Sequence, residues 1–170
     1  MLKPPDSHHL SAAVGWLELG NGGEARLELD KISETLREDP DVLRVWWAVL
    51  AAVENWREAL EISGRLLQKA PDDARSWLHH AYALRRAPGG GVEAAWKVLL
   101  HAAEKFPEEE TIPYNLSCYA CQLGEYDQAR RWLRQAMRRG GREEIRNRAL
   151  NDEDLKPLWW EIRHWKSGAP

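Results

Sequence analysis

Apolar residues recur along most of the chain at the three- and four-residue spacing of amphipathic helices. The clearest segment, residues 115–137, predicts two such helices separated by Gly124, which is suited to end the first of them. Two short helices cannot bury their apolar faces alone, so the hairpin needs neighbours of its own kind. The two stripes consist of Leu116, Ala120, Leu123, Ala129, Leu133 and Ala136.

The same pattern predicts three further helix pairs upstream. The first joins a helix from Asp6 or Ser7 to Leu19, capped by one of these two residues, to a long second helix over residues 24–37. The other pairs are predicted at residues 41–53 with 56–70, and 73–86 with 92–105. Residues 42–53 are apolar almost all round, which predicts burial on two sides.

The spacing of small residues indicates a repeat. Ala25, Ala59, Ala95 and Ala129 are separated by 34, 36 and 34 residues, and the longer interval contains the glycine-rich loop at residues 87–91. Proline closes the second and third units at Pro71 and Pro107. The repeat units are therefore placed at about residues 7–40, 41–71, 72–107 and 108–141.

These features resemble the tetratricopeptide repeat (TPR), a 34-residue helix-turn-helix with small residues at its helix crossings. The resemblance covers residues 7–141 and is best in the fourth unit, at Leu116, Ser117, Gly124, Tyr126, Ala129 and Ala136. It implies an all-α fold, a right-handed α-α superhelix of four helix pairs in one domain over residues 1–170. Related 33- and 35-residue repeats, including RNA-reading ones, are the alternatives. Trp47 replaces a small residue, so the second pair either splays or uses Trp47 to fill a space.

The last part of the chain departs from the repeat and is predicted to cap it, over residues 142–166. Leu155, Leu158, Trp159 and Ile162 follow helical spacing, and a helix there would cover the apolar end of the solenoid. The segment ALNDEDLKPLW is similar to the closing segment of many bacterial TPR proteins without assigned function, and it implies no activity.

Composition and charge argue for a soluble cytoplasmic protein. The net charge is −3, which favours neither nucleic acid nor membrane as a partner, and no apolar stretch approaches the roughly 20 residues of a membrane helix. Two cysteines are too few for a disulfide framework. The charge is uneven, because residues 130–148 contain eight arginines against two glutamates. That segment is a candidate electrostatic patch.

No residue pattern supports catalysis. Cys118 and Cys121 form a CxxC, but redox pairs of this kind lie at a helix N-terminus, whereas this pair falls in the middle of a predicted helix. The adjacent histidines His79 and His80 would point about 100° apart on a helix and could not easily share an ion. We therefore expect no enzyme activity, no cofactor and no metal.

The TPR resemblance implies that the first helix of each pair lines a concave ligand surface. Its ligand-facing positions include Leu10, Ser11, Val14, Val45 and Ala48. The peptide-binding residues predicted on that surface are Arg44, Arg75, His79, Tyr82, Arg85, Arg86, Tyr114, Asn115, Cys118 and Gln122.

These positions predict a non-catalytic protein-protein interaction module, an adaptor or scaffold. The arginines suggest an acidic segment or a free C-terminus as ligand, the alternative being that they only solvate the surface. The clamp of the chaperone-tail-binding members, a lysine and two asparagines, is replaced by Leu10, Val14 and Val45. Two other functions are considered: nucleic-acid binding through residues 130–148, from Arg130 to Arg148, and homo-oligomerisation through the Trp-rich C-terminal end.

Overall fold

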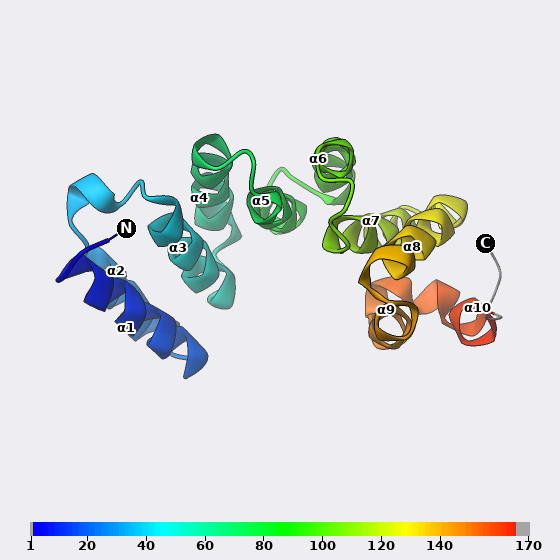
Figure 1. The fold of residues 1–170 in the computed structure, drawn as a ribbon, viewed down its shortest axis with the longest axis horizontal. Coiled ribbons are helices and arrows are strands. Elements are labelled where there is room, and N and C mark those ends of the chain that lie inside the picture. Colours follow the sequence, from blue (N-terminus) through cyan, green and yellow to red (C-terminus); the bar gives the residue numbers. More distant parts are fainter. Residues whose placement is uncertain (1, 166–170) are drawn as a thin grey trace. The chain divides into compact units, whose positions relative to one another are not determined.

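The computed structural model describes residues 2–165, which form helices joined by turns (Figure 1). The chain divides into two compact units, Met1–Gly91 (unit 1) and Val92–Pro170 (unit 2). The single domain expected over residues 1–170 and the repeat boundaries stay predictions. None of the helices described between residues 2 and 165 is long and apolar enough to cross a membrane.

Unit 1 contains two helix pairs and the first helix of a third. Asparagine and aspartate side chains accept hydrogen bonds from the first turns of four of its helices, at Asn21, Asp39, Asn55 and Asp73. Its elements are α1 (Asp6–Glu18), α2 (Gly22–Asp30), the 3-10 helix η1 (Glu34–Leu36), α3 (Pro40–Ala52), α4 (Trp56–Lys69) and α5 (Ala74–Arg86). Two apolar clusters form its core, and Trp46 packs against both.

The second helix of the first pair is shorter than the sequence predicts. The expectation of one helix over residues 24–37 is wrong, because α2 ends at Asp30 and η1 follows after a break. The carboxylate of Asp6 accepts hydrogen bonds from the backbone N–H of Ser33 at 2.6 Å and from its hydroxyl at 3.1 Å. These bonds hold Ser33 in a non-helical conformation. Asp6 therefore fixes the break instead of capping its own helix.

Trp47 fills the space between α3 and α5. Its ring stacks on His79 with 4.0 Å between ring centroids, while α3 and α4 remain packed together. Of the two alternatives considered for Trp47, the filling of a space left by a neighbour is therefore confirmed.

Unit 2 is built around a nearly enclosed helix. It contains α6 (Val92–Lys105), α7 (Thr111–Gln122), α8 (Tyr126–Gly140), α9 (Arg142–Ala149), the 3-10 helix η2 (Glu153–Leu158) and α10 (Trp159–His164). Residues 112–114 and 116–121 of α7 are buried, because the helix packs against α6, α8 and η2. The C-terminal segment thus lies directly on a repeat helix.

The predicted C-terminal helix is divided at Pro157. Proline lacks the N–H of a regular helix and disfavours an α conformation at the residue before it. The chain accordingly forms η2 up to Leu158, and α10 starts at Trp159. The predicted apolar face is nevertheless confirmed, since Leu155 and Ile162 are fully buried. Residue 166, the end of the predicted cap, lies outside the described residues.

Candidate functional site

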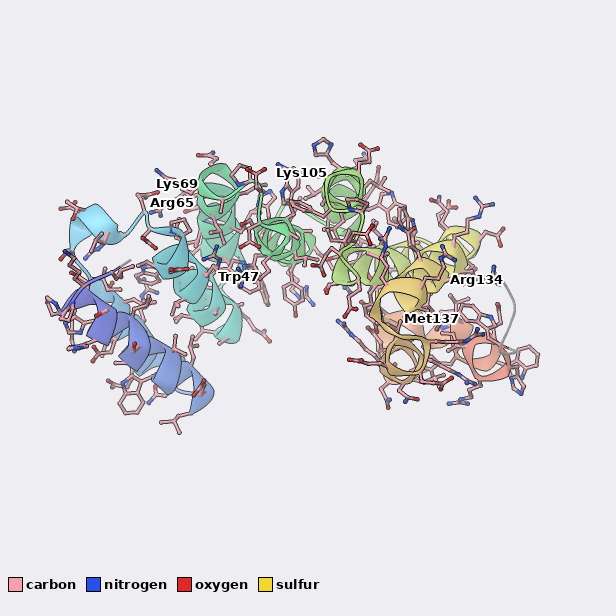
Figure 2. All side chains as sticks on the ribbon, viewed as in Figure 1. Trp47, Arg65, Lys69, Lys105, Arg134 and Met137 are labelled. Carbon is pink, nitrogen blue, oxygen red and sulfur yellow. The ribbon has the colours of Figure 1, made fainter. Side chains whose placement is uncertain are left out.

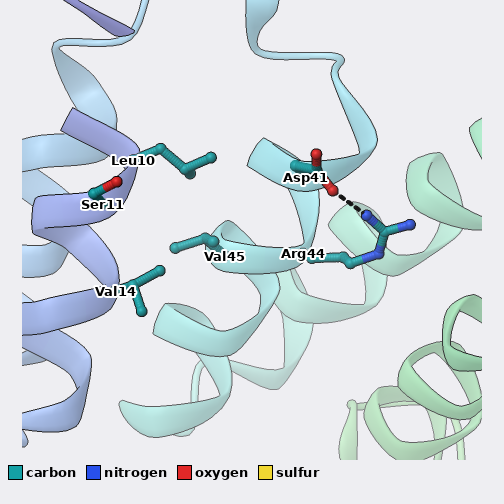
Figure 3. Close-up of a pocket in the computed structure, with 6 residues that line it drawn as sticks. All are labelled: Leu10, Ser11, Val14, Asp41, Arg44 and Val45. Carbon is teal, nitrogen blue, oxygen red and sulfur yellow. Dashed lines mark hydrogen bonds and ion pairs between the residues drawn. The ribbon is translucent and has the colours of Figure 1, made fainter. Parts of the chain in front are cut away.

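A pocket of about 390 Å³ opens between α1 and α3 of unit 1 (Figure 3). Leu10 and Val14 on α1 point toward Val45 on α3, and the Arg44–Asp41 ion pair lies at one edge. Ser11 completes the lining. Five of the six lining residues occupy positions that the sequence predicts to face a ligand, and Asp41 is the addition.

Aspartates hold the two predicted arginines closest to this pocket. Arg44 donates to Asp73 at 2.9 Å, and Arg75 donates to both oxygens of Asp73 at 3.1 and 3.0 Å. Burial raises the pKa of Asp73, but hydrogen bonds from Arg75 and Arg44 outweigh it and leave the pKa below its ordinary value. Arg44 and Arg75 therefore serve the α3–α5 interface as well as the surface.

Aromatic rings continue the same face along α5. Tyr82 lies edge-on to Trp47 with centroids 5.9 Å apart, and its ring centroid lies 5.7 Å from that of Trp56. The guanidinium carbon of Arg86 lies 3.6 Å from the centre of the Tyr82 ring. Arg86 has no carboxylate partner among residues 2–165, and Tyr82 is 38% exposed. Arg86 is therefore the cation of this face best placed to meet an anionic ligand.

His79 is held neutral inside this cluster. Burial lowers its pKa to about 4, with Asp73 opposing the shift and Arg44 and Arg75 adding to it. Its Nδ1 and the Nε1 of Trp47 are buried without hydrogen-bond partners among the described residues. The ring therefore acts at neutral pH as an uncharged stacking partner of Trp47.

We predict that unit 1 loses stability as the pH falls from about 6.5 to 4. Over this range the unfolded chain binds a proton at His79 that the folded chain excludes, so acid favours unfolding by on the order of 2 kcal/mol. Urea denaturation at pH 7 and 4.5 measures the loss. His79→Phe keeps an aromatic ring and should flatten this dependence, whereas the exposed His8→Gln should retain it. Equal pH dependence in both variants would contradict the prediction.

In unit 2, the predicted ligand-facing side of α7 is covered by the chain itself. The Tyr114 hydroxyl donates to Asp152 at 2.8 Å, and the Cys118 thiol lies 3.5 Å from the same carboxylate. Gln122 donates to Asp154. Tyr114 is 1% exposed and Cys118 is 3% exposed. In this structure these two residues contact the capping segment in place of a ligand.

The cysteines have the environment of unreactive thiols. Burial, followed by the Asp152 charge, raises the pKa of Cys118 well above its ordinary value, and burial raises that of Cys121 to about 11. Cys118, Asp152 and Asp154 bring potential metal-ligand atoms within 4.8 Å of one another. Tyr114, Cys118 and Gln122 already donate hydrogen bonds to these two carboxylates. The cluster is therefore best explained as the place where hydrogen bonds from α7 hold the C-terminal cap.

Three of the eight arginines in residues 130–148 make contacts within unit 2 that hold the cap. Arg130 makes two 2.7 Å hydrogen bonds to Glu161, and Arg146 donates to the carbonyls of Ile162 and Arg163. Arg148 lies over the Tyr114 ring at 3.9 Å. These three side chains hold the cap, which leaves fewer charges for nucleic acid than the sequence suggests.

Comparison with solved structures decides the fold. A thermophilic TPR protein of Thermus thermophilus, TTC0263, matches 92% of this chain over 82% of its own length, with a TM-score of 0.72 and 22% identity. The chain has the TPR fold. The MamA RS-1 ArsTM double mutant matches 89% of this chain over 80% of its own, with a TM-score of 0.69 and 18% identity. A MamA structure from MSR-1 matches 95% over 96%, with a TM-score of 0.65 and 15% identity.

No protein-family model and no curated protein sequence matches the chain. The predicted fold class, an all-α TPR-like superhelix, is confirmed by the structural matches. TPR solenoids generally serve as scaffolds for protein-protein interaction. The structural matches thus establish the fold of the chain.

Within the TPR frame, the predicted site residues fall into two sets. Arg44, Arg75, His79 and Tyr82 surround the α3–α5 interface of unit 1, with Arg85 and Arg86 on the last turn of α5. Tyr114, Asn115, Cys118 and Gln122 lie on α7 of unit 2, where Asn115 donates to the carbonyl of Thr111 at 2.8 Å. A single surface formed by all ten stays a prediction.

Sequence reasoning missed the carboxylates that contact these residues. Asp41 and Asp73 pair with the arginines of unit 1, and Asp152 and Asp154 accept from α7 of unit 2. The available signal is the position of each aspartate at or next to a helix start, which by itself is typical of a cap. A capping carboxylate has two oxygens, and the second can bind a distant side chain.

Proposed function

We propose that the protein is an adaptor that binds an extended segment of another protein along α1, α3 and α5 of unit 1. The observation that carries this proposal is the pocket of about 390 Å³ lined by Leu10, Val14 and Val45. A pocket of this size accepts a large apolar side chain, and the apolar side chains that line it favour such a residue. The ligand surface lies in unit 1, because Tyr114 and Cys118 of unit 2 are buried beneath the cap.

The charges along α3 and α5 favour a ligand that carries a carboxylate beyond its apolar anchor. Arg44 and Arg75 are paired with aspartates, whereas Arg86 is held by the Tyr82 ring and has no carboxylate partner among the described residues. A guanidinium fixed on an aromatic ring loses little freedom when it binds a carboxylate. The preferred ligand therefore places an apolar residue between α1 and α3 and an acidic residue near Arg86.

Peptide selection tests this function even though the partner is unidentified. We expect a random peptide library selected on the full chain to be enriched in peptides with a large apolar residue and a nearby acidic one. Val14 is 38% exposed, and Val14→Glu places a charge in the pocket, so it should weaken the selected peptides about tenfold or more. Leu27→Glu on α2, where Leu27 is 54% exposed, should not affect binding.

A charge reversal separates the anchor from the acidic contact. Arg86→Glu should weaken acidic peptides and leave neutral ones unaffected, while Arg57→Glu, an exposed arginine of α4, should change neither. Selected peptides that bind Val14→Glu as tightly as the parent protein would refute the groove. Arg75→Glu is a poor choice for this purpose, since it would place a carboxylate beside Asp73 at the start of α5.

A further inference from the structure

Three arginines of α8 form a stripe on the side of the helix opposite its buried side. At 100° per residue, Arg131, Arg134 and Arg138 fall within an arc of about 60°, whereas the buried Ala129 and Leu133 lie across the helix. Arg131 and Arg138 are exposed, and Arg134 is half-buried. The stripe belongs to the second helix of its pair, so it is separate from the groove proposed in unit 1.

The three guanidinium groups have no carboxylate partner among residues 2–165. The nearby carboxylates of Glu161 and Asp127 are bound by Arg130 instead. Arg134, which Figure 2 labels beside α8, lies with its guanidinium carbon 5.2 Å from the ring centroid of Trp165. The charge of Arg134 adds to that of Arg130 in lowering the pKa of Glu161, so it is partly balanced, and Arg131 and Arg138 contribute most of the positive charge of the stripe.

The stripe is short and is bounded by acidic residues. Arg131 and Arg138 are seven residues apart, about 10 Å along the helix axis. Asp127, one turn before Arg131, is 89% exposed, and Glu143, just after the end of α8, is 68% exposed. A long phosphate backbone would have to pass these carboxylates, whereas a short acidic segment fits between them. The geometry favours a protein ligand over nucleic acid.

The surroundings of the stripe have the composition of a protein-binding surface. Trp160 on α10 is 71% exposed, and the Arg130–Glu161 pair holds α10 against α8. Tryptophan and arginine are the residues most enriched where protein interfaces concentrate their binding energy. Arginine also binds carboxylates through two parallel hydrogen bonds.

We propose that Arg131, Arg134 and Arg138 form a docking surface for a short acidic segment of a partner protein. The segment presents carboxylates at i, i+3 and i+7 along two helical turns, which is the spacing of the arginines. Trp160 is an exposed residue of α10, the helix that the Arg130–Glu161 pair holds against α8. This proposal does not depend on the groove in unit 1, so an experiment can refute either proposal and leave the other intact.

Fluorescence anisotropy with the full chain tests the proposal. The probe is a fluorescein-labelled, alanine-rich helical peptide with glutamates at i, i+3 and i+7, and the matched control peptide carries glutamines there. We expect the glutamate peptide to bind about tenfold or more tighter than the glutamine peptide, with an affinity that falls as salt is added. A glutamine peptide that binds equally well would overturn the proposal.

Charge reversal locates the site. Arg131→Glu with Arg138→Glu should weaken the glutamate peptide about tenfold or more, whereas the exposed Arg57→Glu of unit 1 should leave it unchanged. Equal losses of peptide affinity in the α8 double variant and in Arg57→Glu would overturn the proposal, because they would show that the peptide responds only to the overall charge of the protein. Tighter binding of a 12-nucleotide RNA than of the peptide would overturn it in favour of nucleic acid. Melting temperatures check folding, and Arg131→Gln with Arg138→Gln should give a smaller loss in the same direction.

Discussion

Leu155→Ala should loosen the C-terminal cap and make Cys118 reactive. Leu155 on η2 is fully buried, and η2 packs on α7. Removal of a buried leucine side chain costs about 3 kcal/mol, from lost burial and the cavity that remains. We expect urea denaturation of the variant to show this loss in the transition of unit 2.

The thiol provides a local measurement of the same change. Cys118 is buried beneath Asp152 and its pKa is raised, so the native thiol should react very slowly at pH 8. If the cap opens locally, lowering the free energy of opening by about 3 kcal/mol should accelerate alkylation of Cys118 by about a hundredfold. The exposed neighbour Lys156 makes only surface contacts with Glu153 and the Trp159 ring, so Lys156→Ala should cost less than about 1 kcal/mol and accelerate alkylation much less than Leu155→Ala. An unchanged alkylation rate in Leu155→Ala would contradict a cap that covers α7.

Gly90→Ala should destabilise unit 1 through the loop after α5. A Cβ at Gly90 would lie 1.9 Å from the carbonyl oxygen of Leu84 and 3.0 Å from its carbon. That oxygen also accepts a 3.0 Å hydrogen bond from the N–H of Gly91, which closes the end of α5. Because backbone must move to admit the methyl group, we expect a loss of about 2 to 4 kcal/mol.

A second glycine in the same unit is the matched control. A Cβ at Gly15, inside α1, meets nothing within 4 Å. Gly15→Ala should therefore stabilise unit 1 by up to about 1 kcal/mol, since alanine favours a helix. Circular dichroism during denaturation measures both variants. If the free energy of unfolding changes in the same direction in both variants, the steric explanation for Gly90 is refuted.

The cap restricts the ligand surface that the repeat spacing predicts. By repeat spacing alone, Tyr114 and Cys118 occupy ligand-facing positions of α7. The structure brings Asp152 of the same chain to these positions, and the Tyr114 hydroxyl and Cys118 thiol bind it. We therefore place the proposed ligand groove in unit 1, where the pocket beside Val14 and Val45 is lined by side chains and otherwise open.

Local sequence determined the helices and most of their boundaries. The apolar stripe of residues 115–137, with its glycine turn at Gly124, became α7 and α8 as predicted. Asp73, at the start of the predicted helix over residues 73–86, accepts a hydrogen bond from the first turn of α5. Leu155, Leu158 and Ile162 were assigned to the buried side of the final segment and lie there. These features depend on residues a few positions apart, so periodicity is enough to predict them.

Only the tertiary structure decided what distant residues do to one another. Asp6 ends a helical segment through Ser33, Asp73 binds Arg44, and Asp152 closes the face of α7. Each of these contacts joins residues at least 27 positions apart. A carboxylate binds whichever donor the fold brings within reach, and helical spacing carries no information about that choice. The repeat pattern therefore determined the helices and their order along the chain. The packing of these helices decided which surfaces stay open to a partner.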